Sequence, residues 1–247
     1  MTPFLRWLTA ALFLALPAAS LAGTAEVTAK MDDIWLNRSG DTANMREALA
    51  LADQAWTEGQ TYDVAWRAAR AAFWICDRTE DSATDLEFGQ KGYQWGEKAM
   101  ALKADGVEGH YYYACSLGEY SKGMSIVVAL TKGLGNKYLA ECNKAISLNG
   151  RFDHGGPYRA LGRYYFEVPW PKYDAAKAEQ NYRAASGVDG NFGRTWYYLA
   201  ELYGKEGNTV KEKEALDKLA AIPSLPEAKW EQTFYQDQGK ALAAKMK

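Results

Sequence analysis

Arg159 and Arg163 are the side chains whose spacing most directly suggests chemistry. They stand four residues apart, and helical residues at this spacing lie one turn apart on the same face. Their planar guanidinium groups can therefore converge on one anion through two-pronged hydrogen bonds. Glu167 follows one turn further on and offers Arg163 an ordinary ion pair. The pattern leaves two interpretations: a site for a carboxylate or an acidic peptide, and a solvated helix face with a surface salt bridge.

The sequence contains three runs of consecutive aromatic residues, and some of these side chains must lie outside the core. Three successive helical residues fan across about 200° of the helix, so the core cannot easily take a whole run. Tyrosine suits a half-buried place, because its ring packs while its hydroxyl meets water. These residues either line a groove or fill the seams between packed helices: Tyr111, Tyr112 and Tyr113; Tyr164, Tyr165 and Phe166; Trp196, Tyr197 and Tyr198.

The sequence carries no recognised signature of catalysis, metal binding or cofactor binding. His110 and His154 stand in no His-Glu-x-x-His or similar metal-ligand spacing. A Gly-x-Ser-x-Gly elbow, a phosphate-binding loop and a dinucleotide fingerprint are all missing. We therefore expect no enzyme, no metal and no cofactor. Asp153 and His154 precede Gly-Gly-Pro, which predicts a capped helix start with Pro157 in the first turn.

Three cysteines leave at least one thiol free, namely Cys76, Cys115 or Cys142. In the repeat register described below, Cys115 and Cys142 face each other across one helix pair. A disulfide between them is one interpretation in an exported protein. The other interpretation is that the thiols pack as small buried side chains.

The N-terminus has the features of a secretory signal peptide. Arg6 precedes an apolar run, and Ser20-Leu21-Ala22 forms a small-residue cleavage site. Residues 1–22 are therefore interpreted as a signal peptide, and the protein as exported. A bacterial lipoprotein would have cysteine in place of Thr24, so a soluble protein without a lipid anchor is expected. Because a membrane span needs roughly 20 apolar residues, no span is expected either.

Composition and charge exclude one class of partner. The chain has 247 residues, of which 48% are apolar and 24% charged, as is ordinary for a globular protein with a real core. The formal net charge is −2, and the charges are scattered along the chain. Such a chain provides no basic field for phosphates, so nucleic acid is not an expected partner.

Past residue 40 the sequence predicts an all-α protein made of repeated helix pairs. Small and aromatic residues recur at three- and four-residue steps, as at Ala48, Leu51, Ala52 and Ala55. Turn signals recur at roughly 40-residue intervals, which is typical of helix-pair repeats such as the tetratricopeptide repeat (TPR). Residues 23–247 are predicted to form a single domain, a TPR-like superhelix (solenoid) of about four helix pairs plus flanking helices. The predicted units are residues 61–105, 106–149, 153–189 and 190–223.

Two further segments stand apart from the repeats. Residues 121–135 (SKGMSIVVALTKGLG) are predicted to contain an inserted apolar helix. Its residues 124–130 are apolar nearly all round, which implies burial on most sides. The insert is either a lid over a groove or a helix packed permanently on the superhelix. A C-terminal helix at about residues 226–246 is expected to cap the last core edge, with a docking arm as the alternative.

Two segments carry a resemblance to a known family. The order of the units, residues 118–123 (GEYSKG) and residues 155–163 (GGPYRALGR) resemble the TPR-like T component associated with TRAP transporters, the TatT-like family. The similarity covers roughly residues 42–222. It implies a periplasmic accessory protein that docks a periplasmic partner such as a transporter solute-binding subunit. The alternative is a carrier of a small hydrophobic or carboxylate ligand. The chain departs from the family's lipoprotein form at Thr24.

The repeat register also predicts a binding surface. In TPR superhelices, residues one step past the packing positions of the first helix in each pair line the concave face. The resulting groove is aromatic and charged at once. It consists of Trp66, Arg70, Phe73, Tyr112, Glu119, Arg159, Arg163, Phe166, Tyr197, Glu201 and Lys205. An open groove of this kind favours a protein partner, whereas a deep enclosed pocket favours a small ligand.

Overall fold

The computed structural model describes residues 18–246, and every regular element in that part of the chain is a helix. The all-α class predicted from the sequence is therefore confirmed. The elements are α1 (Ala18–Leu36), α2 (Ala43–Glu58), α3 (Tyr62–Asp77), α4 (Ser82–Leu102), α5 (Val107–Gly123), α6 (Ile126–Thr131), α7 (Leu134–Asn149), α8 (Phe152–Glu167), α9 (Ala175–Val188), α10 (Gly193–Lys205), α11 (Thr209–Ala221), the short 3-10 helix η1 (Pro226–Ala228) and α12 (Lys229–Ala243).

Short polar side chains fix where several of these helices begin. The Thr61 hydroxyl accepts a hydrogen bond from the backbone N–H three residues on, at the start of α3. Asp81 at α4, Asp174 at α9 and Asn208 at α11 accept the equivalent bond. Such caps satisfy backbone N–H groups that the first helical turn leaves without a partner.

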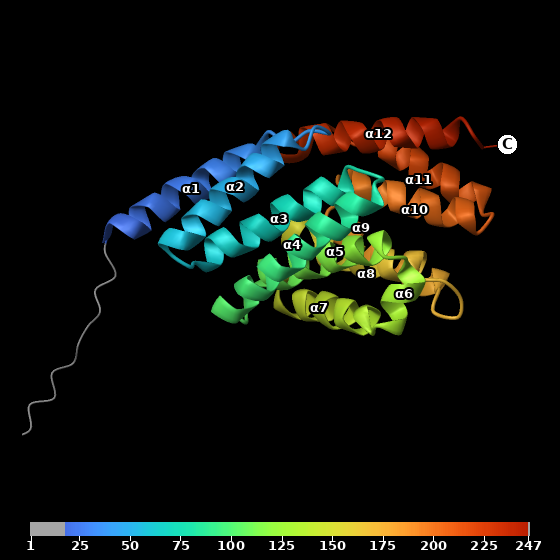
Figure 1. Cartoon of the computed structure of the whole chain (residues 1–247). Helices are drawn as coiled ribbons and strands as arrows, with labels where there is room; N and C mark the ends of the chain where they lie inside the picture. Colours follow the sequence, from blue (N-terminus) through green and yellow to red (C-terminus); the bar gives the residue numbers. More distant parts are fainter. Residues whose placement is uncertain (1–17, 247) are drawn as a thin grey trace, which may run out of the picture.

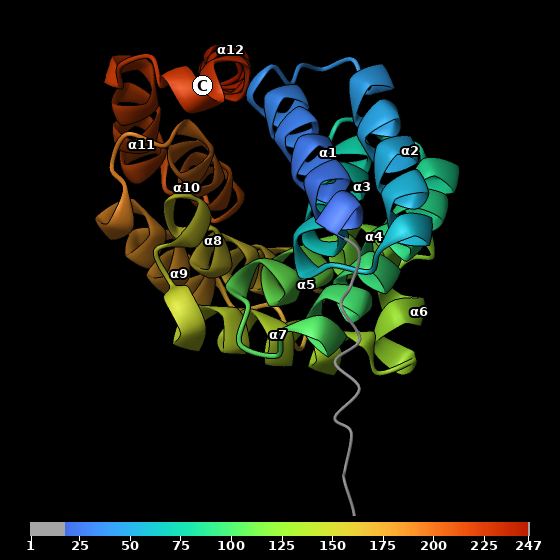
Figure 2. The same ribbon diagram turned by 90° about the vertical axis from the view of Figure 1, so that its left-hand side faces the viewer.

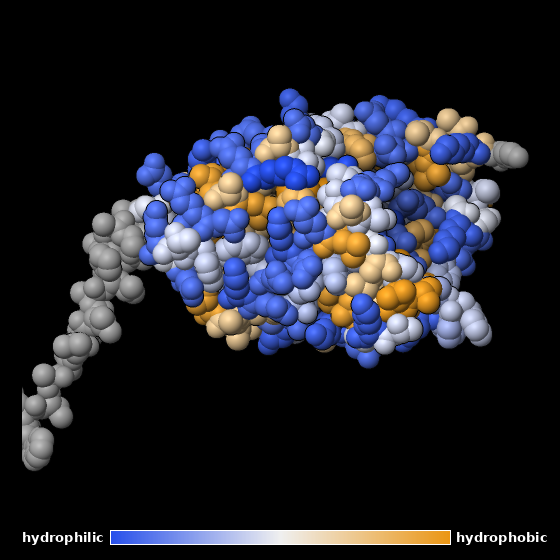
Figure 3. Space-filling model, viewed as in Figure 1, coloured by the Kyte–Doolittle hydropathy of each residue, from blue (hydrophilic) through white to orange (hydrophobic). Residues whose placement is uncertain are grey.

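The helices pack in pairs along a curved path. Helices α3 and α4, α5 and α7, α8 and α9, and α10 and α11 lie against each other (Figure 1). Small residues allow the close approach. A Cβ atom on Gly162 of α8 would lie only 2.6 Å from the ring of Tyr182 on α9. The exposed face in Figure 3 is mostly polar, with apolar side chains in scattered patches.

The curve brings the start of α12 to the C-terminal ends of α1 and α3. Figure 2, viewed along the path, shows α12 beside α1. The indole of Trp230 on α12 meets that of Trp74 on α3 edge to face, with 5.8 Å between ring centres. The same indole lies against Gly40, where a Cβ atom would come within 2.8 Å of it. Helix α12 thus contacts α3 and the segment after α1, and it packs on α10 and α11.

The sequence did not predict α1, which runs straight through the proposed cleavage site at Ala22. Residues 1–17 of the predicted signal peptide lie outside the described residues. From Met31 onward, α1 contributes buried side chains to a core that extends through α8. A second, smaller core joins α9, α10 and α11.

The inserted apolar segment differs from the prediction. Helix α5 continues to Gly123, and α6 is only six residues long. Val127 and Val128 are 59% and 43% exposed, so burial on most sides is wrong. The reason is that α6 lies over α5 and α7 alone, so one face is covered, including the buried Ala129, and the other is open.

Candidate functional site

A cavity of about 340 Å³ lies on the inner side of the superhelix. Its walls come from α3, α5, α6, α7, α8, α10 and α12, so segments far apart in the sequence share one space. Aromatic and charged side chains dominate the walls. They include Phe73, Asp77, Arg78, Tyr111, Glu119, Lys122, Tyr138, Arg159, Arg163, Tyr164, Glu167, Arg194, Tyr197, Tyr198, Glu201, Phe234 and Tyr235.

Six of the eleven residues predicted for the concave face line this cavity. They come from four different helices, which the repeat register alone had placed on one surface. They are Phe73, Glu119, Arg159, Arg163, Tyr197 and Glu201. The structure thus brings together the part of the predicted groove that lies between α3 and α10.

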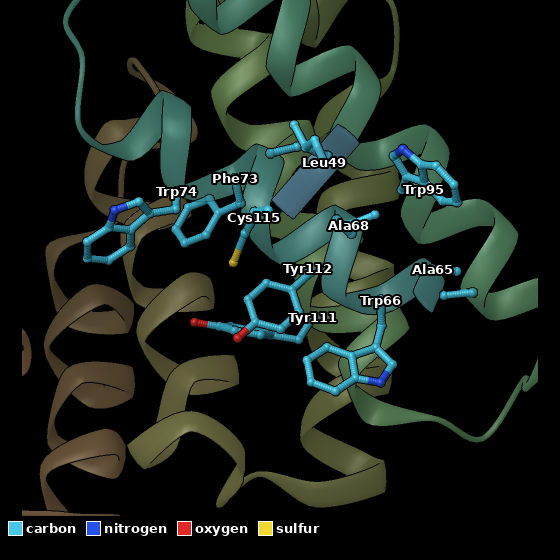
Figure 4. Close-up of a cluster of buried hydrophobic side chains, with 14 of the residues drawn as sticks. Leu49, Ala65, Trp66, Ala68, Phe73, Trp74, Trp95, Tyr111, Tyr112 and Cys115 are labelled. Carbon is cyan, nitrogen blue, oxygen red and sulfur yellow. The ribbon is translucent and has the colours of Figure 1, made fainter. Parts of the chain in front are cut away.

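Three of the remaining five, Trp66, Arg70 and Tyr112, are buried instead. The guanidinium of Arg70 donates to the Asp32 carboxylate of α1 over 2.8 Å, and its carbon lies 4.7 Å from the ring centre of Trp35. Trp66 stacks on Tyr112, with 6.2 Å between ring centres (Figure 4). Arg70 packs on α1, and Trp66 and Tyr112 pack on each other, so the prediction that these residues line an open groove is wrong.

The last two predicted residues, Phe166 and Lys205, lie outside the cavity walls. The ammonium of Lys205 donates to the backbone carbonyl of Phe166 over 3.0 Å and lies 4.5 Å from its ring centre. They pair with each other between the C-terminal ends of α8 and α10. The predicted groove therefore does not reach this end as a cavity.

Arg159 holds an unusual backbone turn rather than an open anion site. Asp153, His154 and Gly155 all have positive φ angles, of 48°, 54° and 80°. Left-handed backbone is costly for residues with a Cβ atom, and here it replaces the side-chain cap expected from the sequence. The buried guanidinium of Arg159 donates to the backbone carbonyls of Asp153 and His154 and to the Asp153 carboxylate. The Tyr111 hydroxyl donates to the same carboxylate over 2.8 Å.

Arg163 is occupied as well. Its guanidinium pairs with Glu167 one turn on, as the surface interpretation expects, and also with Glu201 of α10 over 2.8 Å. Burial alone would lower the pKa of Arg163, but the neighbouring Tyr198 and Glu201 raise it well above its ordinary value. Because Arg159 and Arg163 have separate partners, the expectation that they converge on one anion is wrong.

A network of buried ion pairs, which the sequence analysis missed, joins α3, α10 and α12 beside the cavity. Arg194 of α10 donates to Asp77 at the end of α3 over 2.6 Å and pairs with Glu231 of α12 over 2.8 Å. Glu231 also accepts from Arg38 over 2.8 Å, and Asp77 pairs with Arg78. Burial alone would raise the pKa of Asp77, but Arg194 and Arg78 hold it far below its ordinary value.

No sequence signal could have identified this network with certainty. Arg38 and Glu231 are 193 positions apart, and no repeat rule relates them. The hint in the sequence is limited to charged residues at the ends of otherwise apolar helices, as in Asp77-Arg78 after the buried run of α3. Only the closure of the superhelix brings them together.

Of the aromatic runs, one fills the seams between packed helices and another lines the cavity. Tyr111, Tyr112 and Tyr113 are all buried, because each of the three turns toward a different neighbour: Phe152, Trp66 and Tyr93 respectively. The run from Trp196 to Tyr198 is half-buried, and two of its members line the cavity. Packing thus absorbs one run and leaves another at the open wall.

The three cysteines are free and buried, so the structure lacks the predicted bridge between Cys115 and Cys142. Both thiols occupy small-residue positions between packed helices, which a sulfhydryl fills without a covalent bond. Burial raises the pKa of both thiols, which disfavours reactive thiolates. In Figure 4, Cys115 lies near Phe73 in the core.

Within residues 18–246, no three side chains of His, Cys, Asp or Glu gather as metal ligands would. None of the helices described has the length and apolar character required to cross a membrane.

The fold has a solved counterpart. A thermophilic TPR protein of Thermus thermophilus superposes with a TM-score of 0.61 at 17% sequence identity, covering 81% of this chain and 91% of that protein. At this identity the similarity shows the fold alone, and it supports the TPR-like superhelix predicted from the sequence.

The sequence matches a different family from the transporter-associated one that it was expected to resemble. The chain is 26% identical over 213 residues to regulator of microtubule dynamics protein 3 of Xenopus laevis, a match that covers 79% of this chain and 45% of that protein. The chain therefore corresponds to less than half the length of this curated relative. The family model of regulator of microtubule dynamics protein 1-3 matches residues 27–247.

These matches overturn the resemblance to the TRAP-associated T component and everything that rested on it. The periplasmic location and the solute-binding partner were inferred from that resemblance. The signal peptide was inferred from residues 1–22, and it too conflicts with the matched family. The shared segments around residues 118–123 and 155–163 reflect helix packing in a TPR-like fold, which many families use. The chain belongs to the family of regulator of microtubule dynamics protein 1-3.

Proposed function

We propose that this chain is a protein-binding module that receives an extended segment of a partner in its concave cavity, and that the partner belongs to the microtubule system. The second part comes from the relative, whose name describes a regulator of microtubule dynamics. The first part comes from the geometry of the inner face.

The observation that carries the proposal is the cavity itself. Inside a TPR-like superhelix, seven helices surround a space lined by aromatic and charged side chains. Such a mixture suits peptide recognition, because aromatic rings provide contact area and polar groups fix orientation. Tyr197 and Tyr198 are half-buried on its wall and so have surface left to bury.

The size of the cavity limits what can enter. A volume of about 340 Å³ is at the lower end of ligand pockets, which span roughly 300–1,000 Å³. It accommodates a few side chains of an extended segment, whereas a folded domain is excluded. The rest of such a partner would lie outside, along the rim.

The proposal is tested with purified tubulin. Growth rates and catastrophe frequencies of single microtubules are measured by fluorescence microscopy with wild-type protein and with Ala160→Phe, which places a ring in the cavity. We expect the wild type to change at least one rate and Ala160→Phe to have several-fold less effect. Equal effects of both proteins would exclude the cavity, and no effect of the wild type would exclude a direct action on microtubules.

A further inference from the structure

Arg78 is a buried cation with hydrogen-bond donors left over. It follows the last residue of α3, and its side chain is only 3% exposed. Its Nη2 donates to Asp77 and, over 3.3 Å, to the hydroxyl of Tyr235. Its Nε and Nη1 are buried and have no hydrogen-bond partner among the described residues. Native proteins seldom leave buried donors without acceptors, so the donors of Arg78 indicate a missing acceptor.

Aromatic rings hold this guanidinium in place. Its carbon lies 4.6 Å from the ring centre of Phe234 and 4.7 Å from that of Trp74. Rings attract a cation through their faces but do not replace an oxygen acceptor at the edge of the guanidinium. Arg78 is thus positioned on the cavity wall, and two of its buried nitrogens have no acceptor among the described residues.

The charge network that contains Arg78 has more positive than negative groups, which also favours an anion. The network joins three guanidinium groups, of Arg38, Arg78 and Arg194, to two carboxylates, of Asp77 and Glu231. The excess is one positive charge. A single carboxylate matches it, whereas a phosphate carries more charge than the network lacks.

The other charges on the cavity walls are already paired. Lys122 pairs with Glu119, Arg163 pairs with Glu167 and Glu201, and Arg159 pairs with Asp153. Among acidic side chains near the cavity, Glu80 is exposed to solvent. Two of these groups are neutral pairs, and Arg163 with its two carboxylates has a net negative charge, so an incoming anion is drawn to Arg78 rather than to them.

Thr79 adds a second free group beside Arg78. Its hydroxyl is buried, lacks a hydrogen-bond partner among the described residues, and belongs to the same cavity wall. A carboxylate has two oxygens, so it can accept from Arg78 with one and from the threonine hydroxyl with the other.

The geometry points to a carboxylate-recognition site at Arg78 and Thr79 for an acidic segment of a protein partner. This inference rests on the proposed function, since it specifies which segment the cavity receives. Two sources supply the chemistry: the side chain of an aspartate or glutamate, and the carboxyl terminus of the partner. Arg159 and Arg163, which the sequence analysis singled out, then line the cavity, while Arg78 binds the carboxylate.

The test begins with random heptapeptides with free carboxyl termini, displayed on phage and selected on the wild-type protein. Selected peptides are synthesised with a fluorescent label in three forms: unchanged, with each Asp or Glu replaced by Asn or Gln, and with an amidated C-terminus. Fluorescence anisotropy gives their dissociation constants for wild type, Arg78→Gln, Arg78→Lys and Ala160→Phe. Circular dichroism confirms that each variant is folded.

We expect selected peptides to lose at least tenfold in affinity when their essential carboxylate is neutralised, since charge-assisted hydrogen bonds in a buried site have this magnitude. Arg78→Gln should abolish the preference, so that the neutral and acidic forms differ less than twofold, and Arg78→Lys should keep part of it. Loss in the side-chain form identifies an internal acidic residue, and loss in the amide form identifies a chain terminus.

The opposite outcomes separate this inference from the proposed function. If peptides bind and Ala160→Phe abolishes binding, but neutral forms bind as tightly as acidic ones, the cavity receives a segment and the carboxylate site is refuted. If Arg78→Gln retains the tenfold preference, another residue reads the charge, and the site is refuted in the same way. If Ala160→Phe binds every selected peptide as wild type does, the cavity itself is excluded. The comparison of peptide forms on wild-type protein needs no variant, so a poorly folded Arg78→Gln would not leave the inference untested.

Discussion

One half of the inner surface is covered by packed side chains, whereas the other half lines an open cavity. Between α1 and α3, the inward-facing Trp66 and Arg70 are covered, and the Asp32 carboxylate of α1 satisfies Arg70. Between α3 and α10, the inward-facing Phe73, Tyr197 and Glu201 line a cavity. One register rule selects both halves, so it identifies the inner face without telling which part stays open. For Arg70 the difference is made by α1, a helix outside the repeat pattern.

The largest expected effect concerns the network that closes the open half. Arg194→Ala leaves Asp77 and Glu231 buried without their shared partner, and breaking a buried ion pair in this way typically costs about 3–5 kcal/mol. Urea denaturation should show this loss. The control is Lys213→Ala, which removes an exposed pair with Asp217 and should change stability by about 0.5 kcal/mol or less. Equal losses in both variants would show that the network does not close the superhelix.

Matched substitutions measure how open each half is. Ala69 is fully buried in the core, so Ala69→Phe should cost about 3 kcal/mol through overpacking. Ala160 lines the cavity, so Ala160→Phe has space and should cost about 1 kcal/mol or less. The free energy of unfolding of both variants checks this difference. If Ala160→Phe were the costlier of the two, the cavity would not be a real space.

The cavity wall also depends on the turn that starts α8. Gly155 has φ of 80°, and a Cβ atom there would lie 2.9 Å from the Cα of Ala185. Gly155→Ala should therefore destabilise by about 2 kcal/mol, from backbone strain and the clash. Gly187 of α9 has open space around its Cα, so Gly187→Ala should stabilise the helix by about 0.5–1 kcal/mol. The midpoint of thermal unfolding should fall for Gly155→Ala and rise for Gly187→Ala. A shift of both midpoints in the same direction would argue against a strained turn.

The smallest expected effect concerns the covered half. Burial alone would raise the pKa of Asp32, but hydrogen bonds from Arg67 and Arg70 lower it. A lowered pKa stabilises the fold above the unfolded value of about 3.9, and this contribution disappears as the pH falls through the folded value. Asp32→Asn should cost about 1–2 kcal/mol at pH 7, because the carboxylate is partly exposed.

The same variant should begin to approach wild-type stability as the pH falls below about 4, where Asp32 of the unfolded chain becomes protonated, and should match it below the lower pKa of the folded state. Urea denaturation at several pH values between 3 and 7 measures the gap. Asp237→Asn serves as the control, because Asp237 pairs with Lys240 on the surface and its pair is exposed. A gap that is independent of pH would show that the charge of Asp32 does not hold α1 in place.

The sequence was sufficient for features that depend on neighbouring residues. Turns and small-residue positions are local, so the pairing of helices and the inward register of Arg163, Tyr197 and Glu201 could be predicted. The engagement of Arg163 with Glu167 follows from the same short spacing.

Features that depend on distant contacts could not be predicted. The pairing of Arg38 with Glu231 requires that α12 reach the N-terminal helices, and the role of Arg78 follows from that closure. The left-handed turn at Asp153 and His154 is stabilised by Tyr111 and Arg159 across the fold, whereas the Gly-Gly-Pro sequence indicated an ordinary cap. The short similarity to another family misled because its segments report helix packing rather than ancestry.

The proposal that the open half of the inner face binds a microtubule-system partner is tested most directly by site-specific crosslinking. A photo-reactive benzoyl-phenylalanine replaces Tyr197 on the cavity wall, Trp66 under α1, or Lys213 on the outer face, and each protein is irradiated with purified tubulin. We predict tubulin adducts from the Tyr197 position and several-fold fewer from the other two. Equal or greater crosslinking from Lys213 would contradict the proposal, and so would a lack of adducts from all three positions.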